Sequence, residues 1–359
     1  MKAAVLKEFG RPLAVEEVAD PAPGTGETVV DVAAAPVLHY SDEVLSGARR
    51  YLLELPAIPG VGAVGRVRSA GPDATKLRPG DWVFCDPTVR SRDDAVTPDI
   101  ALQGWSARGE GGARLQRHFR DGGWAEQVMI PTENAIPLGG IDAADAGRWA
   151  TLSLCLVPYG GFLDGGLQPG GTVVISGATG AYGGAAVAVA VAMGAGRVIA
   201  PGRNRAALAD LERRFGRRVR AVVLSGNEDE DRAAMQAAAE GPVDLVLDIL
   251  PPSAPAAAAR AAAMTVREFG RVVLMGGVGM LGGDDLALPY PWLMRNSVTV
   301  RGRWMAPRDA VPRMIALMRS GLLDLAQFQI DEFALSAADE AVRHAAKAGG
   351  RFRLTVLRP

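Results

Sequence analysis

A glycine-rich run between two apolar segments limits most strongly how this chain can fold. Residues Gly177 to Gly184 read GATGAYGG, follow the apolar run Thr172 to Ser176 and open into an alanine-rich segment. Glycines at this spacing let the backbone turn tightly and approach a pyrophosphate, and free N–H groups at a helix start attract phosphate charge. The run therefore predicts a turn between a strand and a helix that can hold a dinucleotide.

The rhythm of the chain around this run supports the same interpretation. Strand-like runs begin at Thr172, Arg197, Ala221, Val243, Gly270 and Ser297, and helix-like segments begin at Ala181, Asn204, Glu230 and Pro255. Such alternation predicts a parallel sheet wound by helices on both faces. A packing turn in an unrelated α/β protein would carry similar glycines. The second strand, however, ends about 20 residues after them, as a dinucleotide-binding unit requires.

The first third of the chain has a different pattern. Short apolar runs separated by Pro and Gly predict a small, mainly antiparallel β domain there. The last strand, Phe352 to Leu357, is expected to return to it. Residues 86–122 are polar and lack periodicity, so they form either an ordered excursion or a flexible lobe. We expect one domain from residues 1–135 and 306–359, and a Rossmann domain from residues 136–305.

Composition excludes several classes of protein. A net charge of −1 over 359 residues gives no general electrostatic reason to bind nucleic acid or an anionic membrane, which favours a small-molecule substrate. Two cysteines, Cys85 and Cys155, are too few for a disulfide framework. The longest apolar stretch, Gly183 to Gly196, is too short to cross a bilayer, and no secretory signal begins the chain. We expect a cytoplasmic protein.

The expected cofactor is NADP(H). Where an NAD site usually offers an acidic residue to the ribose, this chain has Gly202, followed by Arg203 and Arg205. Two guanidinium groups suit a 2′-phosphate, although the same arginines could simply begin a solvated helix. The predicted cofactor-binding residues are Gly177, Ala178, Thr179, Gly180, Ala181, Tyr182, Gly183, Gly202, Arg203, Arg205, Ser225, Gly276 and Gly277.

Several motifs in order resemble those of the medium-chain dehydrogenase/reductases. They include MKAAVLKEFG, IPGVGAVGRV, LRPGDWV, GGWAEQVMIP, the glycine-rich run, FGRVVLMGG and VTVRGRW. The resemblance implies a GroES-like catalytic domain made from both chain ends, a Rossmann domain between them, and hydride transfer in the cleft.

Departures from the zinc-containing branch of this family are equally informative. Where those relatives have a Gly-His-Glu turn, this chain reads Gly60-Val61-Gly62. His39 and Cys155 fall near the two other ligand positions, but catalytic zinc needs three protein ligands. Residues 86–122 contain no cysteine, so the four-cysteine structural zinc of many relatives is not expected either. We predict no metal and interpret Cys155 as a buried small side chain.

Without a metal, hydride transfer favours acceptors already activated by conjugation, such as enones, enals or quinones. The chain in this respect is similar to the zinc-free quinone oxidoreductases and enoyl reductases, some of which use a tyrosine as proton donor. Tyr40 and Tyr51 qualify by position, and His39 is a candidate acid or hydrogen-bond donor. Alternatively, the tyrosines line the pocket wall and His39 is structural.

The sequence is compatible with three alternative functions, and it also predicts how two copies of the chain would associate. The first function is NADPH-dependent reduction of an activated C=C bond, the second is metal-free reduction of a carbonyl or imine, and the third is NADPH binding without turnover. The strand Ser297 to Gly302 lies at the predicted edge of the Rossmann sheet and follows a bulky apolar run. An unprotected edge invites pairing, so we expect a homodimer through it.

Overall fold

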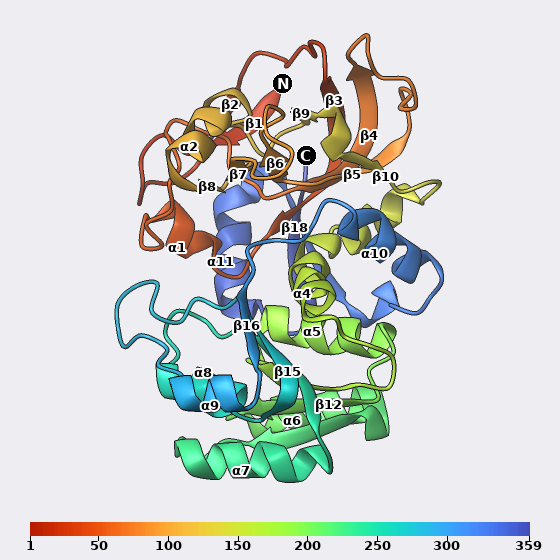
Figure 1. Ribbon diagram of the computed structural model, residues 1–359. Coiled ribbons are helices and arrows are strands. Elements are labelled where there is room, and N and C mark those ends of the chain that lie inside the picture. The colour runs from red at the N-terminus through yellow and green to blue at the C-terminus, as the bar shows by residue number, and fades with distance from the viewer. The chain divides into compact units, whose positions relative to one another are not determined.

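The computed structural model describes residues 1–359 and divides into two compact units (Figure 1). The first unit comprises residues 1–153, 325–349 and 353–359, and the second comprises residues 154–324 and 350–352. The sequence predicts the two changes of domain at 135/136 and 305/306. Compared with the predicted domain, the first unit of the structure thus has a longer N-terminal part and a shorter C-terminal part.

Six parallel strands form the sheet of the second unit, in the order β13-β12-β11-β14-β15-β16. They are β11 (Thr172–Ser176), β12 (Arg197–Gly202), β13 (Val219–Val223), β14 (Val243–Asp248), β15 (Val266–Leu274) and β16 (Thr299–Gly302). The chain builds outward from β11 to β13 and then returns to add β14, β15 and β16 on the other side. This order confirms the predicted doubly wound sheet.

Helices connect these strands, as the alternation predicts. Those that follow a strand directly are α5 (Ala181–Ala192), α6 (Arg205–Phe215), α7 (Glu228–Ala239) and α8 (Ala256–Ala263). The other α-helices in this part of the chain are α4 (Leu152–Gly165), α9 (Tyr290–Arg295) and α10 (Ala310–Arg319). No helix of the chain combines the length and apolar composition that a bilayer span requires.

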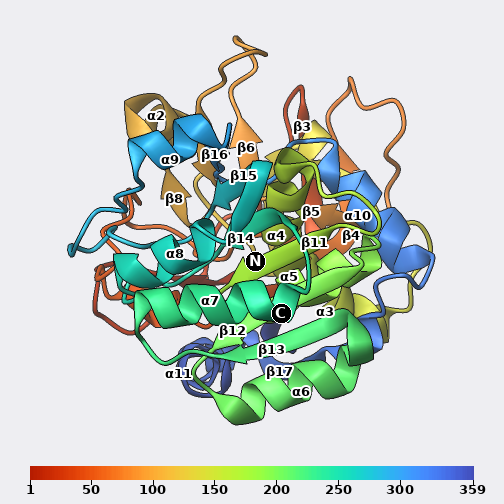
Figure 2. The ribbon, with the colours of Figure 1, turned by 60° about the horizontal axis from the view of Figure 1, so that its bottom comes forward.

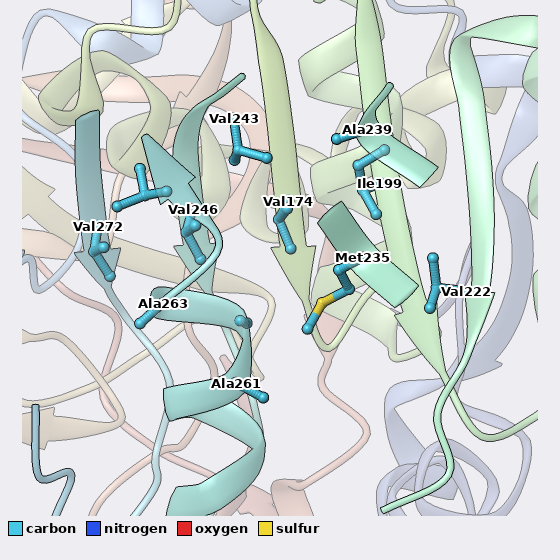
Figure 3. Close-up of a cluster of buried hydrophobic side chains, with 12 residues drawn as sticks. Val174, Ile199, Val222, Met235, Ala239, Val243, Val246, Ala261, Ala263 and Val272 are labelled. Atoms are coloured by element: carbon cyan, nitrogen blue, oxygen red, sulfur yellow. The ribbon is translucent and has the colours of Figure 1, made fainter. Parts of the chain in front are cut away.

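Helices α7 and α8 lie against each other and cover one face of the sheet (Figure 2). The core beneath them takes apolar side chains from the five strands β11 to β15, and Figure 3 shows these side chains converging with those of both helices. Its labelled strand members are Val174, Ile199, Val222, Val243, Val246 and Val272. Small alanines on α8 let that helix approach the sheet closely, and this packing holds the central strands in place.

A mainly antiparallel sheet of seven strands forms the body of the first unit, in the order β10-β5-β4-β3-β18-β17, with β9 also paired to β3. The strands are β3 (Glu27–Val37), β4 (Ala63–Ala70), β5 (Trp82–Cys85), β9 (Gln127–Pro131), β10 (Ala135–Pro137), β17 (Gln329–Ala334) and β18 (Arg353–Arg358). Because β18 pairs antiparallel with β3, the last strand returns to this unit as predicted.

Smaller elements complete the first unit. Strands β1 (Lys2–Val5) and β2 (Ala14–Glu17) form an antiparallel pair, and the helices are α1 (Ser41–Leu45), α3 (Ala146–Trp149) and α11 (Ala338–Ala348). The structure confirms both predicted folds, a GroES-like, mainly antiparallel domain and a Rossmann sheet.

Residues 86–122, for which the sequence left two alternatives open, form an ordered excursion. Strands β6 (Thr88–Arg90), β7 (Ile100–Leu102) and β8 (Ser106–Ala107) make a small antiparallel sheet, and α2 (Gly109–His118) follows. His118 Nε2 lies 2.5 Å from Glu27 Oε1, and Arg117 pairs with Glu54 at 2.9 Å. These contacts attach the excursion to the rest of the first unit.

Candidate functional site

The glycine-rich run forms a turn that requires glycine at Gly177 and Gly183. Gly177 directly follows β11 and has a φ of +96°, a conformation that L side chains rarely adopt. At Gly183, a Cβ atom would lie 1.9 Å from the carbonyl oxygen of Gly177, so any side chain would push α5 off the turn. Gly180 precedes α5 and supplies no side-chain cap. The N–H groups of the first turn are therefore open to an anionic ligand, as a pyrophosphate cradle requires.

The end of β12 passes close to this turn. A Cβ atom at Gly202, the last residue of β12, would lie 2.5 Å from Thr179 Cγ2, so a glycine is needed there as well. Arg203 and Arg205 follow it, both exposed and neither with an acidic partner in the chain. Between them, the Asn204 side chain caps α6 by accepting the Ala207 N–H at 3.0 Å. Because Asn204 supplies the cap, both guanidinium groups stay available to a phosphate.

Three other predicted cofactor residues follow strands of the same sheet. Ser225 lies after β13, where its N–H and hydroxyl both donate to Asp231 Oδ1, at 2.6 and 3.1 Å. This network closes the loop before α7, so Ser225 has a structural role that the sequence did not indicate. Gly276 and Gly277 follow β15, and a Cβ atom on either would lie within 2.7 Å of the loop after β14. These strand ends lie where doubly wound sheets bind ligands.

The sequence did not single out Asp248, the last residue of β14. Its side chain is 4% exposed and borders Gly276, whose Cβ atom would lie 2.6 Å from Asp248 Oδ2. Burial raises the pKa of Asp248 to about 6, while hydrogen bonds from the Ser176 side chain and the Leu250 backbone partly oppose the rise. An aspartate at the end of a strand is a weak signal in a sequence, because such residues commonly begin solvated turns.

Two of the candidate proton donors lie together in the first unit. His39 and Tyr40 occupy the connection between β3 and α1, with ring centroids 5.2 Å apart in an edge-on arrangement. Trp105 packs edge-on against Tyr40 at 5.9 Å, and the Arg49 guanidinium lies 4.3 Å from the Tyr40 ring centre. Glu43 pairs with Arg49 at 2.7 Å. The Tyr40 ring is thus held on several sides.

The protonation state of His39 follows from its surroundings. Burial lowers the pKa of His39 below its ordinary value, and the positive charge of Arg49 lowers it further. A histidine in this environment is neutral at neutral pH. His39 is therefore suited to hydrogen bonding as a neutral imidazole rather than to proton donation as an imidazolium.

Tyr51 lies elsewhere in the same unit. It is half-buried, precedes the short bridge between Leu52 and Ala107, and has no hydrogen bond or ring contact within the chain. Its hydroxyl is available to a ligand. Ser41, which the sequence analysis passed over, follows Tyr40 directly; its hydroxyl is fully buried and has no hydrogen-bond partner. Buried hydroxyls normally have one, so Ser41 joins the candidate residues.

The residues at the metal positions of zinc relatives do not fit a catalytic zinc ion. Val61 carries no donor atom, and its neighbours Gly60 and Gly62 have φ values of +118° and +81°, which disfavour any larger side chain. Cys155 is fully buried, and burial raises the pKa of its thiol, which keeps it protonated. No group of three or more His, Cys, Asp or Glu side chains in residues 1–359 could hold a metal ion. Catalytic zinc needs three such ligands.

Comparison with known proteins agrees with this architecture. The model of the alcohol dehydrogenase GroES-like domain matches residues 24–140, and that of the zinc-binding dehydrogenases matches residues 181–320. An alcohol dehydrogenase of Moraxella sp. is 34% identical over 204 residues, which are 54% of this chain and 56% of the relative. An acryloyl-coenzyme A reductase of Metallosphaera sedula is 29% identical over 195 residues, 54% of this chain and 57% of the relative.

The chain thus matches a little over half the length of these curated relatives. Among solved structures, alcohol dehydrogenase TADH from Thermus sp. ATN1 has the same fold, with a TM-score of 0.81 and 22% identity over 100% of both chains. The relatives named here do not include the quinone oxidoreductases of the zinc-free branch, so that finer part of the resemblance stays a prediction. The chain is thus similar to the alcohol dehydrogenase GroES-like domain over residues 24–140 and to the zinc-binding dehydrogenases over residues 181–320, and the solved structure shares its fold.

Proposed function

We propose that the chain is an NADPH-dependent oxidoreductase that transfers hydride, without zinc, to an activated C=C bond in an enone, an enal or a quinone. The observation that carries the proposal is the presence, in one chain, of a dinucleotide cradle and of Val61 and Gly62, which offer no ligand side chain, where zinc relatives have a His-Glu pair. The glycine turn before α5 supports a nicotinamide dinucleotide. The exposed, unpaired Arg203 and Arg205 support one with a 2′-phosphate. The bound cofactor would supply the hydride.

The class of acceptor follows from the chemistry that these residues can support. Hydride transfer leaves an anion that must be stabilised and then protonated. A conjugated acceptor spreads this charge over its own carbonyl group, so it depends less on a metal than a simple ketone does. Tyr40 and Tyr51 are the proposed proton donors. His39, neutral and beside the Tyr40 ring, is the proposed hydrogen-bonding group.

The names of the two relatives favour different acceptors. The Moraxella relative is an alcohol dehydrogenase, so metal-free reduction of a carbonyl or imine is the second candidate function. The Metallosphaera relative, named for acryloyl-coenzyme A, reduces a substrate class with a C=C bond conjugated to a carbonyl, and favours the first. Binding of NADPH without turnover is the third candidate, and it would appear as cofactor affinity without cofactor oxidation.

A panel of acceptors tests the proposal. Purified protein is given NADPH, and in parallel NADH, with enones, enals, quinones, simple ketones and cyclic imines, and cofactor oxidation is followed by absorbance. We expect turnover of the conjugated acceptors with NADPH and little with simple ketones. Faster turnover of ketones or imines would favour the second function. Tight NADPH binding with no acceptor turned over would favour the third.

Metal analysis tests the zinc-independent part separately. Because Val61 and Gly62 offer no ligand side chain, we expect less than stoichiometric zinc in the purified protein and unchanged turnover after treatment with a strong chelator. One tightly bound zinc per chain, together with turnover that the chelator abolishes and added zinc restores, would contradict this expectation.

A further inference from the structure

Asp248 lies where the two halves of the Rossmann sheet meet. The strand order reverses between β11 and β14, and Asp248, at the end of β14, is in register with Ser176, at the end of β11. Ser176 directly precedes Gly177, the first glycine of the cradle. In open α/β sheets, ligands bind outside the carboxyl ends of the strands at this reversal. The Asp248 carboxyl is therefore at the base of the expected cofactor site.

This carboxyl connects three loops that border the site. The Ser176 side chain and the Leu250 backbone hydrogen-bond to it. Its own backbone carbonyl accepts the Met275 N–H at 2.9 Å, and the Leu250 carbonyl accepts the Gly277 N–H at 2.8 Å. The segments that follow β11, β14 and β15 thus meet at one residue. Gly276 leaves just enough room for it, because a Cβ atom there would lie 2.6 Å from Asp248 Oδ2.

No charged group compensates the buried carboxyl. Its Oδ1 atom is buried without a hydrogen-bond partner, and no Lys, Arg or His pairs with it. The other ionisable side chain in the segments around it, residues 172–184, 249–252 and 272–277, is Tyr182. On β14 itself, Asp244 lies at the opposite end, where it pairs with Arg267 at 2.7 Å. A buried carboxylate without a cation is costly, and protonation removes that cost.

We propose that Asp248 is a positioning residue of the cofactor site, which ties the three loops of the cradle together and takes up one proton from solvent when the dinucleotide binds. The inference rests on the proposed function, because it requires a dinucleotide in the cradle. Phosphate groups at the start of α5 add negative charge near a carboxylate that is already poorly solvated, and like charges favour its neutral form. The direction follows from linkage: binding that takes up a proton becomes tighter as pH falls.

The pH range in which this proton is taken up follows from the pKa of the carboxyl. Burial already raises the pKa of Asp248 to about 6 in the protein without ligand, so the carboxyl is mostly ionised at pH 8. Bound phosphate raises the pKa further. Uptake is therefore expected between about pH 6 and pH 8, where the free protein has the carboxylate and the complex has the acid. Below about pH 5 both are protonated, and the affinity levels off.

The test measures the NADPH dissociation constant and proton uptake from pH 5 to 8. Intrinsic fluorescence gives the constant, and calorimetry in two buffers of different ionisation enthalpy gives the protons. The 2′-phosphate of NADPH itself titrates near pH 6, so each profile is compared with that of Asp248→Asn and repeated with NADH. As pH falls from 8 to 5, we expect the affinity of the unaltered protein for NADPH to rise. This rise should be larger than that of Asp248→Asn by a factor of about three or more.

Two further variants make the test specific. Asp244→Asn removes an exposed carboxylate from the same strand and should leave the pH profile unchanged. Ser176→Ala removes the hydroxyl that favours the ionised form, so its profile should move to higher pH; it also serves as the test variant if Asp248→Asn does not fold.

The possible results are distinct. Equal pH profiles for the unaltered protein and Asp248→Asn, with no net proton uptake with either cofactor, would overturn the inference. So would a Ser176→Ala profile identical to that of the unaltered protein. A protein that binds neither NADPH nor NADH at any pH would instead contradict the proposed function.

Discussion

We propose that the choice between NADPH and NADH depends on Arg203 and Arg205. Both follow β12 and are exposed without an acidic partner. We expect Arg203→Ala to weaken NADPH binding about tenfold or more, because a charge-assisted hydrogen bond contributes roughly 1.5 to 3 kcal/mol, and to change NADH binding little. Fluorescence titration with both cofactors measures this. Arg217→Ala, an exposed arginine after α6, is the control. Equal losses for both cofactors would show that Arg203 is structural.

The two tyrosines can be separated by their effect on turnover. If Tyr40 donates the proton, Tyr40→Phe should lower kcat about 100-fold or more, the usual contribution of a general acid, with the NADPH dissociation constant unchanged. Tyr51→Phe should then keep most of the activity. The reverse result would assign the role to Tyr51, and near-normal kcat in both variants would exclude both and point to Ser41, whose buried hydroxyl is unpaired.

The glycine turn is the element that most clearly joins structure to function. An alanine at Gly180 would fit, since φ there is −83° and its Cβ atom would lie 3.5 Å from the Gly177 carbonyl oxygen. At Gly183 the corresponding distance is 1.9 Å. Gly180→Ala should therefore keep the midpoint of thermal unfolding but weaken cofactor binding, because the second glycine gives the pyrophosphate its close approach. Gly183→Ala should lower both the midpoint of thermal unfolding and the affinity for the cofactor.

Circular dichroism on heating and NADPH titration measure the two effects. A Gly180→Ala variant with unchanged affinity would show that the pyrophosphate does not lie at this turn. A Gly183→Ala variant as stable as the unaltered protein would contradict the close packing of α5 on the turn.

The elements that the sequence predicts well are those of the Rossmann sheet. Strands buried on both faces leave continuous apolar runs such as TVVIS, and the helices between them have their own period, so the alternation is clear. For residues 86–122 the sequence left an ordered excursion and a flexible lobe both open, because β6, β7 and β8 have only two or three residues each. Pattern cannot identify strands so short.

For the site, the sequence pattern predicts the backbone conformation better than it predicts the contacts and burial of the side chains. The cradle was predictable because its glycines stand at a recognisable spacing, and because Gly177 by its φ and Gly183 by its close packing accept no other residue. Ser225 was expected to contact the cofactor, which stays a prediction; the sequence did not indicate that its hydroxyl donates to Asp231. Asp248 was missed because its burial depends on which strands become neighbours. Such side chains are identified only when the topology brings distant segments together.

At the scale of the whole molecule, we propose a dimer through the exposed edge of the Rossmann sheet. β16 pairs with β15 on one side only, and its four residues are all exposed, Val300 to 36%. On α9, which precedes this strand, Tyr290 is 77% exposed and Met294 59%. An unpaired strand beside exposed apolar side chains is a template for another chain. A two-fold axis would pair the two β16 strands antiparallel into one continuous sheet.

Val300→Lys should therefore separate the dimer, because each lysine would face the like charge of its copy near the axis. Light scattering at micromolar concentration should give about 75 kDa for the unaltered protein, twice the 37.5 kDa of one chain, and the monomer mass for the variant. Val223→Lys is the matched control, since Val223 is 39% exposed on β13, the opposite edge strand, and should leave the dimer intact. A monomeric unaltered protein would refute this interface, and a dimer that persists in Val300→Lys but not in Val223→Lys would place it at the β13 edge.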